Sequence, residues 1–69
     1  MTDDLRPIKP PRGVGVLHDD GRWVGGLQDA WVRWPSGEWR ASVAYSVVNE
    51  WGQDRHLRSL LAERVRLPV

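Results

Sequence analysis

The sequence contains no cysteine and no phenylalanine, and it has only one tyrosine, one methionine and one lysine. The absence of cysteine excludes disulfide bonds, thiolate metal sites and cysteine nucleophiles. A chain of 69 residues is long enough for one domain, and such a domain buries only about 60 % of the surface that its unfolded chain exposes. Because no disulfide can reinforce so thin a core, packing or a partner subunit must hold the fold together.

A strong net charge is also lacking, since ten basic and nine acidic residues leave a net charge of +1. This balance gives no bulk signal for nucleic-acid binding, which is usually marked by a strongly basic face. No apolar run approaches the roughly 20 residues that span a bilayer. Residues 1–5 are acidic and lack the charged-then-apolar pattern of a signal peptide. We therefore expect a cytoplasmic protein with no membrane partner.

Catalytic and metal-binding patterns are missing as well. His18 and His56 lie far apart in the sequence, with no third ligand at metal spacing. The serines have no histidine at motif spacing, and the glycine pairs lack the lysine and the helix of a phosphate-binding loop. We expect no enzymatic activity, no metal and no cofactor, so the protein is predicted to act by binding.

Residues 1–12 contain Pro7, Pro10 and Pro11 among charged residues. Proline at this density disfavours helix and sheet and favours an extended arm. We therefore predict a flexible proline-rich tail over residues 1–12 and a folded domain over residues 13–69. Pro7 to Arg12 also fits the proline-rich pattern with an arginine that SH3 domains bind, so the segment is interpreted either as a linker or as a ligand motif.

Two turn signals of the same design follow the tail. Two aspartates precede Gly21, and a proline and a serine precede Gly37; in each case one charged residue and then a tryptophan follow the glycine. A turn that ends in a left-handed glycine needs this chemistry, so both segments predict β-hairpins. The paired glycines Gly25 and Gly26 predict a bulge or bend in the strand between the turns.

The strand after the second turn alternates clearly. A three-residue turn in this hairpin would place Trp31 on the buried side of the sheet, and Trp34 beside Arg40 on the other side. The predicted inner residues are Trp39, Ala41, Val43, Tyr45 and Val47, and the predicted outer residues are Glu38, Arg40, Ser42, Ala44 and Ser46.

Residues 54–66 allow two interpretations. Leu57, Leu61 and Val65 have helical spacing, and Asp54 would cap such a helix. Alternatively, residues 56–60 form a strand, residues 61–63 a short helical turn, and residues 64–67 a last strand. The second interpretation is favoured because four strands of a small barrel need a fifth to close the edge.

The segments 37–43 and 60–67 resemble parts of SH3-like and Tudor-like barrels. Gly37 to Val43 is similar to the strand in which an acidic-glycine turn precedes tryptophan, arginine and alanine, and Leu60 to Leu67 is similar to the one-turn 3₁₀ helix and last strand. The resemblance implies an all-β fold, a small five-stranded SH3-like barrel with a short 3₁₀ turn before the last strand. A β-meander with one C-terminal helix is the alternative. The paired tyrosines and the last-turn proline of true SH3 domains are absent, which puts polyproline binding in doubt.

The tryptophans divide into two groups on this fold. Trp23, Trp31 and Trp39 occupy positions compatible with the inner face and are predicted to build the core. Trp34 and Trp51 are predicted to lie outside it, either as binding residues or as a cover over the barrel mouth. Exposed aromatic residues beside arginine are typical of binding hot spots.

Two functions from different classes remain. The first is a protein-interaction module, with a protein partner or a homo-oligomer, that uses Trp34, Arg40 and Trp51. The second is a small nucleic-acid-binding barrel, in which the basic stretch at residues 55–66 acts with the same tryptophans. The phosphate-binding candidates in that stretch are Arg58, Arg64 and Arg66. The near-zero net charge favours the first.

Overall fold

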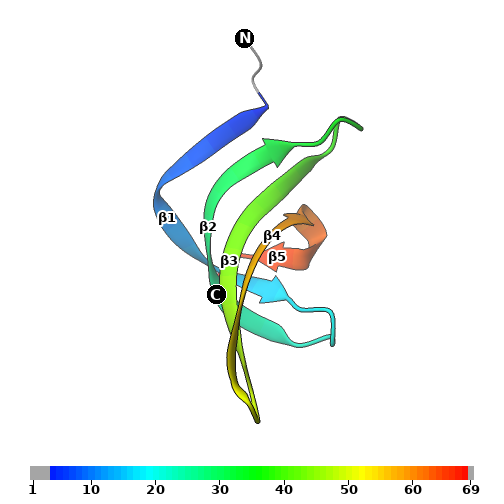
Figure 1. Cartoon of the computed structure of the whole chain (residues 1–69). Coiled ribbons are helices and arrows are strands. Elements are labelled where there is room, and N and C mark those ends of the chain that lie inside the picture. The colour runs from blue at the N-terminus through cyan, green and yellow to red at the C-terminus, as the bar shows by residue number, and fades with distance from the viewer. Residues whose placement is uncertain (1–3, 69) are drawn as a thin grey trace.

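The computed structural model describes residues 4–68, which form one antiparallel sheet of five strands in the order β4-β3-β2-β1-β5. The sheet curls into a half-barrel, and the short β5 follows a single 3₁₀ turn, η1 (Figure 1). The all-β class, the five strands and the 3₁₀ turn are therefore confirmed, and the strand-turn-strand interpretation of residues 54–66 holds. The elements are β1 Leu5–Leu17, β2 Trp23–Arg33, β3 Trp39–Asn49, β4 Gly52–Leu61, η1 Ala62–Arg64 and β5 Val65–Arg66.

The two predicted hairpins form because their turn chemistry is local. The amide of His18 donates to the carbonyl of Arg22 at 2.8 Å, and the amide of Trp34 donates to the carbonyl of Glu38 at 2.7 Å. Gly21 and Gly37 have φ angles of 88° and 95°, in the region that favours glycine over residues with a Cβ. The resulting register is the expected one.

The core lies on the inner face of the sheet, which we define as the face that carries Tyr45. The alternation predicted for β3 is confirmed at residues 41, 43, 45 and 47, which are buried. Trp39 is only half-buried and is not part of the core cluster, so the prediction that it builds the core is wrong. β1 contributes to the same core from one side, and β4 contributes from the other. The core cluster comprises Val14, Val16, Ala41, Val43, Tyr45, Val47 and Leu60, with Val24, Trp31 and Val65 packed against it.

The proline-containing segment differs from the predicted flexible tail in the residues that the structure describes. Residues 5–12 belong to β1, and Leu5 and Arg6 lie opposite Val32 and Trp31 of β2. The strand register shifts between Pro7 and Arg12, where prolines cannot donate to the ladder. Residues 5–7 thereby give residues 30–32 of β2 a strand neighbour on the side opposite β3. Residues 1–3 of the predicted tail lie outside the described residues.

Two local predictions about β2 are wrong. Trp23 lies opposite Leu17 and remains 38 % exposed, so it does not build the core. The irregularity of the β2–β3 ladder falls between Gln28 and Ala30, so the prediction of a bulge at the paired glycines is wrong, while a bend there stays a prediction. Gly26 instead permits close packing, because a Cβ there would lie 2.9 Å from the carbonyl oxygen of Ala44.

No helix in residues 4–68 is long and apolar enough to cross a membrane.

Candidate functional site

The outer face of the sheet, opposite the core, carries a shallow groove along β3. The floor of this groove consists of three small side chains, Ser42, Ala44 and Ser46, at alternate positions of the strand. Alternation directs these side chains away from the core. Because these side chains are shorter than the leucines on the neighbouring strands, they leave a depression in the outer face along β3.

Leucines form the walls of this outer groove. Leu27 of β2 and Leu57 of β4 lie opposite Ala44 on its two sides, and they are 53 % and 75 % exposed. Hollows of about 290 Å³ and 210 Å³ lie on either side of this leucine row. The groove therefore combines exposed apolar walls with a floor that can receive side chains of a partner.

Trp34 and Arg40 lie at one end of the outer groove. The guanidinium carbon of Arg40 lies 4.6 Å from the centre of the Trp34 ring, and Arg40 donates to Glu38 Oε1 at 2.6 Å and 3.0 Å. Stacking and ion pair together orient the Arg40 guanidinium over the Trp34 ring, and side chains oriented before binding lower the entropy cost of binding a partner. The predicted pairing of Trp34 with Arg40 on the outer face is thus present.

Trp51 lies far from this pair, at the opposite end of β3. It occupies the β3–β4 turn, is 88 % exposed, and donates its amide to Asn49 Oδ1 at 2.8 Å. Strand geometry separates the two ends of β3 by roughly 30 Å, and Figure 1 shows the β3–β4 hairpin as an arm that extends beyond the other strands. Trp34 and Trp51 therefore do not form one compact site.

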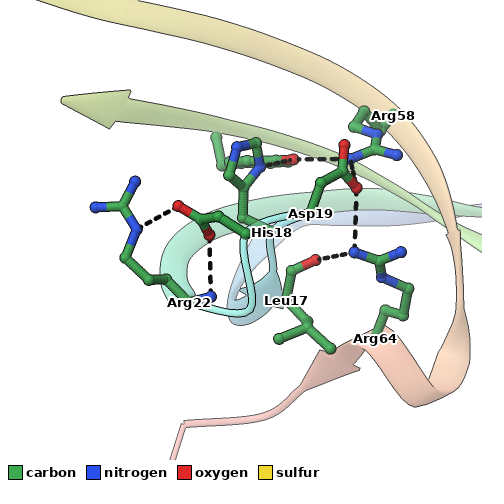
Figure 2. A network of polar contacts seen from close by, with 8 residues as sticks. Leu17, His18, Asp19, Arg22, Arg58 and Arg64 are labelled. Atoms are coloured by element: carbon green, nitrogen blue, oxygen red, sulfur yellow. Dashed lines mark hydrogen bonds and ion pairs between the residues drawn. The ribbon is translucent and has the colours of Figure 1, made fainter. Parts of the chain in front are cut away.

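Arg58 and Arg64, two of the arginines predicted to contact phosphate, converge on Asp19 of the β1–β2 turn (Figure 2). Arg58 donates to Asp19 Oδ1 at 2.9 Å, and Arg64 donates to the same oxygen at 3.2 Å and to the Leu17 carbonyl at 2.9 Å. The hydrogen bond from Arg58 is the main cause that lowers the pKa of Asp19. The Tyr45 hydroxyl and then Asp19 raise the pKa of Arg58. These arginines thus join the first turn to β4 and η1.

Arg66 lies apart from Arg58 and Arg64. Its guanidinium carbon lies 4.0 Å from the centre of the Trp23 ring, and its backbone lies opposite Gly15. A Cβ at Gly15 would come within 3.1 Å of Arg66 Cγ, so the glycine leaves room for this stack. The basic stretch therefore does not present its three candidate arginines as one surface.

Two further clusters were not predicted from the sequence. His18 and His56 lie with ring centres 5.0 Å apart, and both contact the ring of Tyr45. On the inner face, the guanidinium carbon of Arg6 lies 4.7 Å from the centre of the Trp39 ring. The described residues contain no group of three or more His, Asp or Glu side chains that could hold a metal ion.

The groove itself was also missed at the sequence level, although one signal pointed to it. The alternation of β3 already places Ser42, Ala44 and Ser46 on the outer side. Leu27 and Leu57 become its walls only through the registers of β2 and β4, which depend on long-range pairing.

No protein-family model, curated protein or solved structure matches the chain.

Proposed function

We propose that this chain is a small, non-catalytic cytoplasmic module of SH3-like barrel type that binds a protein through its outer groove. The observation that carries the proposal is the row of Leu27, Ala44 and Leu57, which lie side by side across three strands with both leucines exposed. An exposed apolar row that crosses neighbouring strands is typical of an interaction site.

The Trp34–Arg40 pair supplies the polar and aromatic end of this site. Tryptophan and arginine are enriched among residues that contribute most to binding energy, particularly where they are held in place before binding. Arg40 is already oriented by Glu38. We therefore expect an apolar segment of the partner to occupy the groove and an acidic or aromatic group to contact the Trp34–Arg40 end.

Nucleic-acid binding has less support from the same side chains. Asp19 accepts from both Arg58 and Arg64, so a phosphate would have to compete with an existing carboxylate. Arg66 lies over Trp23 instead of beside the other two. Phosphate-driven binding also weakens steeply with salt. The nucleic-acid alternative therefore predicts a strong salt dependence, and the protein-binding proposal does not.

The experiment that tests the proposal fills the groove. The full chain is immobilised, and proteins retained from an extract of the source cells are identified by mass spectrometry, for wild type and for Ala44→Leu. Val48→Leu is the matched control, because Val48 lies on the same side of β3 but on the arm beyond the groove. We expect Ala44→Leu to lose a protein that Val48→Leu retains.

The contrary outcome is equally defined. If both variants retain the same proteins in the same amounts, the groove is not the binding surface. Fluorescence anisotropy with mixed oligonucleotides at low salt is measured in parallel. Saturable oligonucleotide binding that disappears as salt rises, with no groove-dependent protein, would replace the proposal with the nucleic-acid alternative.

A further inference from the structure

The sheet ends at β4, whose outer edge has no neighbour in the described part of the chain. We refer to this as the free edge of β4. The register of β3 with β4 runs from Arg40–Leu61 to Asn49–Gly52 without a shift, whereas the β1–β2 and β2–β3 ladders are both irregular. β4 also contains no proline. A long, regular edge without a bulge or proline lacks two of the devices that block pairing with another strand, although β4 carries charged side chains.

The β3–β4 turn determines which backbone groups face this edge. Asn49 lies opposite Gly52 across a two-residue turn, a pair that exchanges both of its hydrogen bonds. Hydrogen-bonded pairs recur at every second residue, so the even-numbered residues 54–60 bond to β3. The amides and carbonyls of the odd-numbered residues 53–61 consequently point outward from the free edge.

Leu57 therefore has two relevant features at one position. Its backbone groups point outward from the edge, and its side chain ends the apolar row that begins at Leu27 and crosses Ala44. It is 75 % exposed, the most exposed leucine of the described chain. A strand that pairs here and brings another apolar side chain opposite Leu57 would extend the row.

We propose that the occupant of the free edge is a second copy of this chain, with the two β4 strands antiparallel about a two-fold axis at Leu57. Leu57 of one copy then lies opposite Leu57 of the other, and the leucine row continues across both sheets. The inference names a partner for one wall of the outer groove, and in that respect it rests on the proposed function.

The charges along β4 favour this register over its neighbours. A two-fold axis perpendicular to the sheet must fall on a residue, since otherwise inner and outer side chains would oppose each other. Axes at Arg55 or Arg58 would place like charges directly opposite, which destabilises a sheet. The Leu57 axis instead pairs Arg55 with Ser59 and Arg58 with His56 of the other copy, so no two arginines lie directly opposite.

An axis at Ser59 would pair only residues 57–61, because β4 ends at Leu61. An axis at His56 is therefore the remaining competitor. It would pair Arg58 with Asp54 of the other copy, but Arg58 already binds Asp19 and Asp54 already accepts from Asn49 at 2.7 Å. It would also place Arg55 opposite Leu57 and interrupt the apolar row. The Leu57 axis preserves both existing contacts and joins the two rows, so it is the favoured arrangement.

This register also gives the exposed arm a neighbour. Gln53 of one copy lies opposite Leu61 of the other, so the tip with Trp51 extends past the end of the second β4 toward η1. A two-stranded ribbon has little stability of its own in water. Contact with the second copy would support the arm and cover part of Trp51.

The test measures the mass of the full chain by sedimentation velocity over a range of concentrations. We expect wild type to reach twice the monomer mass of 7.9 kDa, and Leu57→Lys to weaken association by about tenfold or more because two lysines would meet at the axis. Leu67→Lys is the matched control, since Leu67 is 57 % exposed but lies outside β4. Circular dichroism establishes that each variant is folded.

Single cysteines test the register, because the chain has no other cysteine. Facing residues in a hydrogen-bonded antiparallel pair have Cα atoms about 5.5 Å apart, within disulfide range. We expect Leu57→Cys to oxidise to a linked dimer faster than Leu67→Cys. A linked dimer from His56→Cys in place of Leu57→Cys would overturn the proposed axis.

A chain that stays monomeric at every concentration would overturn self-pairing. Capture of an extended peptide of another protein at β4 of a monomer would do so as well, and would leave the outer groove intact as a protein-binding site. A dimer that forms as described, with no protein lost on Ala44→Leu, would instead retain this inference while the proposed function fails.

Discussion

Arg58 donates to the carboxylate of Asp19 at 2.9 Å, although the two residues are 39 positions apart in the sequence. The contact joins the β1–β2 turn to the edge strand β4 (Figure 2). The pairings of β4 with β3 and of β1 with β5 leave these two regions in different parts of the sheet order. The ion pair is thus a tertiary contact between two parts of the fold and not a contact within one hairpin.

The first prediction concerns pH. The pKa of Asp19 is lowered from 3.8 in the folded protein, chiefly by the hydrogen bond from Arg58. Because the folded pKa lies below the unfolded one, the stabilisation is present above pH 3.8 and is lost as pH falls through the folded pKa. The free energy of unfolding of wild type and of Asp19→Asn, measured in denaturant, should therefore converge at acidic pH. A difference that stays constant below this pH would contradict the assignment.

A second prediction compares neighbouring glycines of β2. An added Cβ at Gly26 would lie 2.9 Å from the Ala44 carbonyl and 3.0 Å from Tyr45 Cβ, whereas one at Gly25 meets nothing within 4 Å. We expect Gly26→Ala to destabilise the fold by about 1–3 kcal/mol through overpacking. Gly25→Ala should have little effect. Equal stabilities of the two variants in thermal unfolding would show that the strands do not approach as closely as described.

A third prediction concerns Gln28, the one fully buried polar side chain of the described core. Its amide oxygen accepts from Arg12 at 3.0 Å, and its amide nitrogen donates to the Ala30 carbonyl at 3.1 Å. Gln28→Ala leaves a cavity and removes both bonds, so we expect a loss of about 2–4 kcal/mol in denaturant unfolding. The control Gln53→Ala changes an exposed glutamine and should stay within about 0.5 kcal/mol of wild type.

Local chemistry explains which parts of the fold could be predicted. The hairpins at Gly21 and Gly37 depend on a few adjacent residues, and the inner face of β3 depends on simple alternation, so both follow from the sequence. The prediction that Trp23 builds the core is wrong because the face on which Trp23 lies depends on its pairing with β1. Its ring contacts Arg66, which follows it by 43 residues in the sequence. This contact joins residues that are distant in the sequence, so local patterns do not predict it.

The candidate site was predictable only in part for the same reason. Trp34 and Arg40 meet across one hairpin, and their pairing could be foreseen from the turn length. Leu27 and Leu57 lie on different strands on either side of β3, and nothing local indicates that they face the same Ala44. Likewise, the sequence predicts a basic patch that includes Arg58 and Arg64, but in the folded chain both arginines pair with Asp19.

The central claim is that the outer groove of β3 binds a protein. The most direct test is an amide chemical-shift map of the isotope-labelled chain, titrated with a protein retained by wild type and lost on Ala44→Leu. We predict that the shifted amides cluster at Leu27, Ala44 and Leu57 and extend to Trp34. Shifts confined to the inner face around Trp31 and Trp39, with the groove unchanged, would contradict the account.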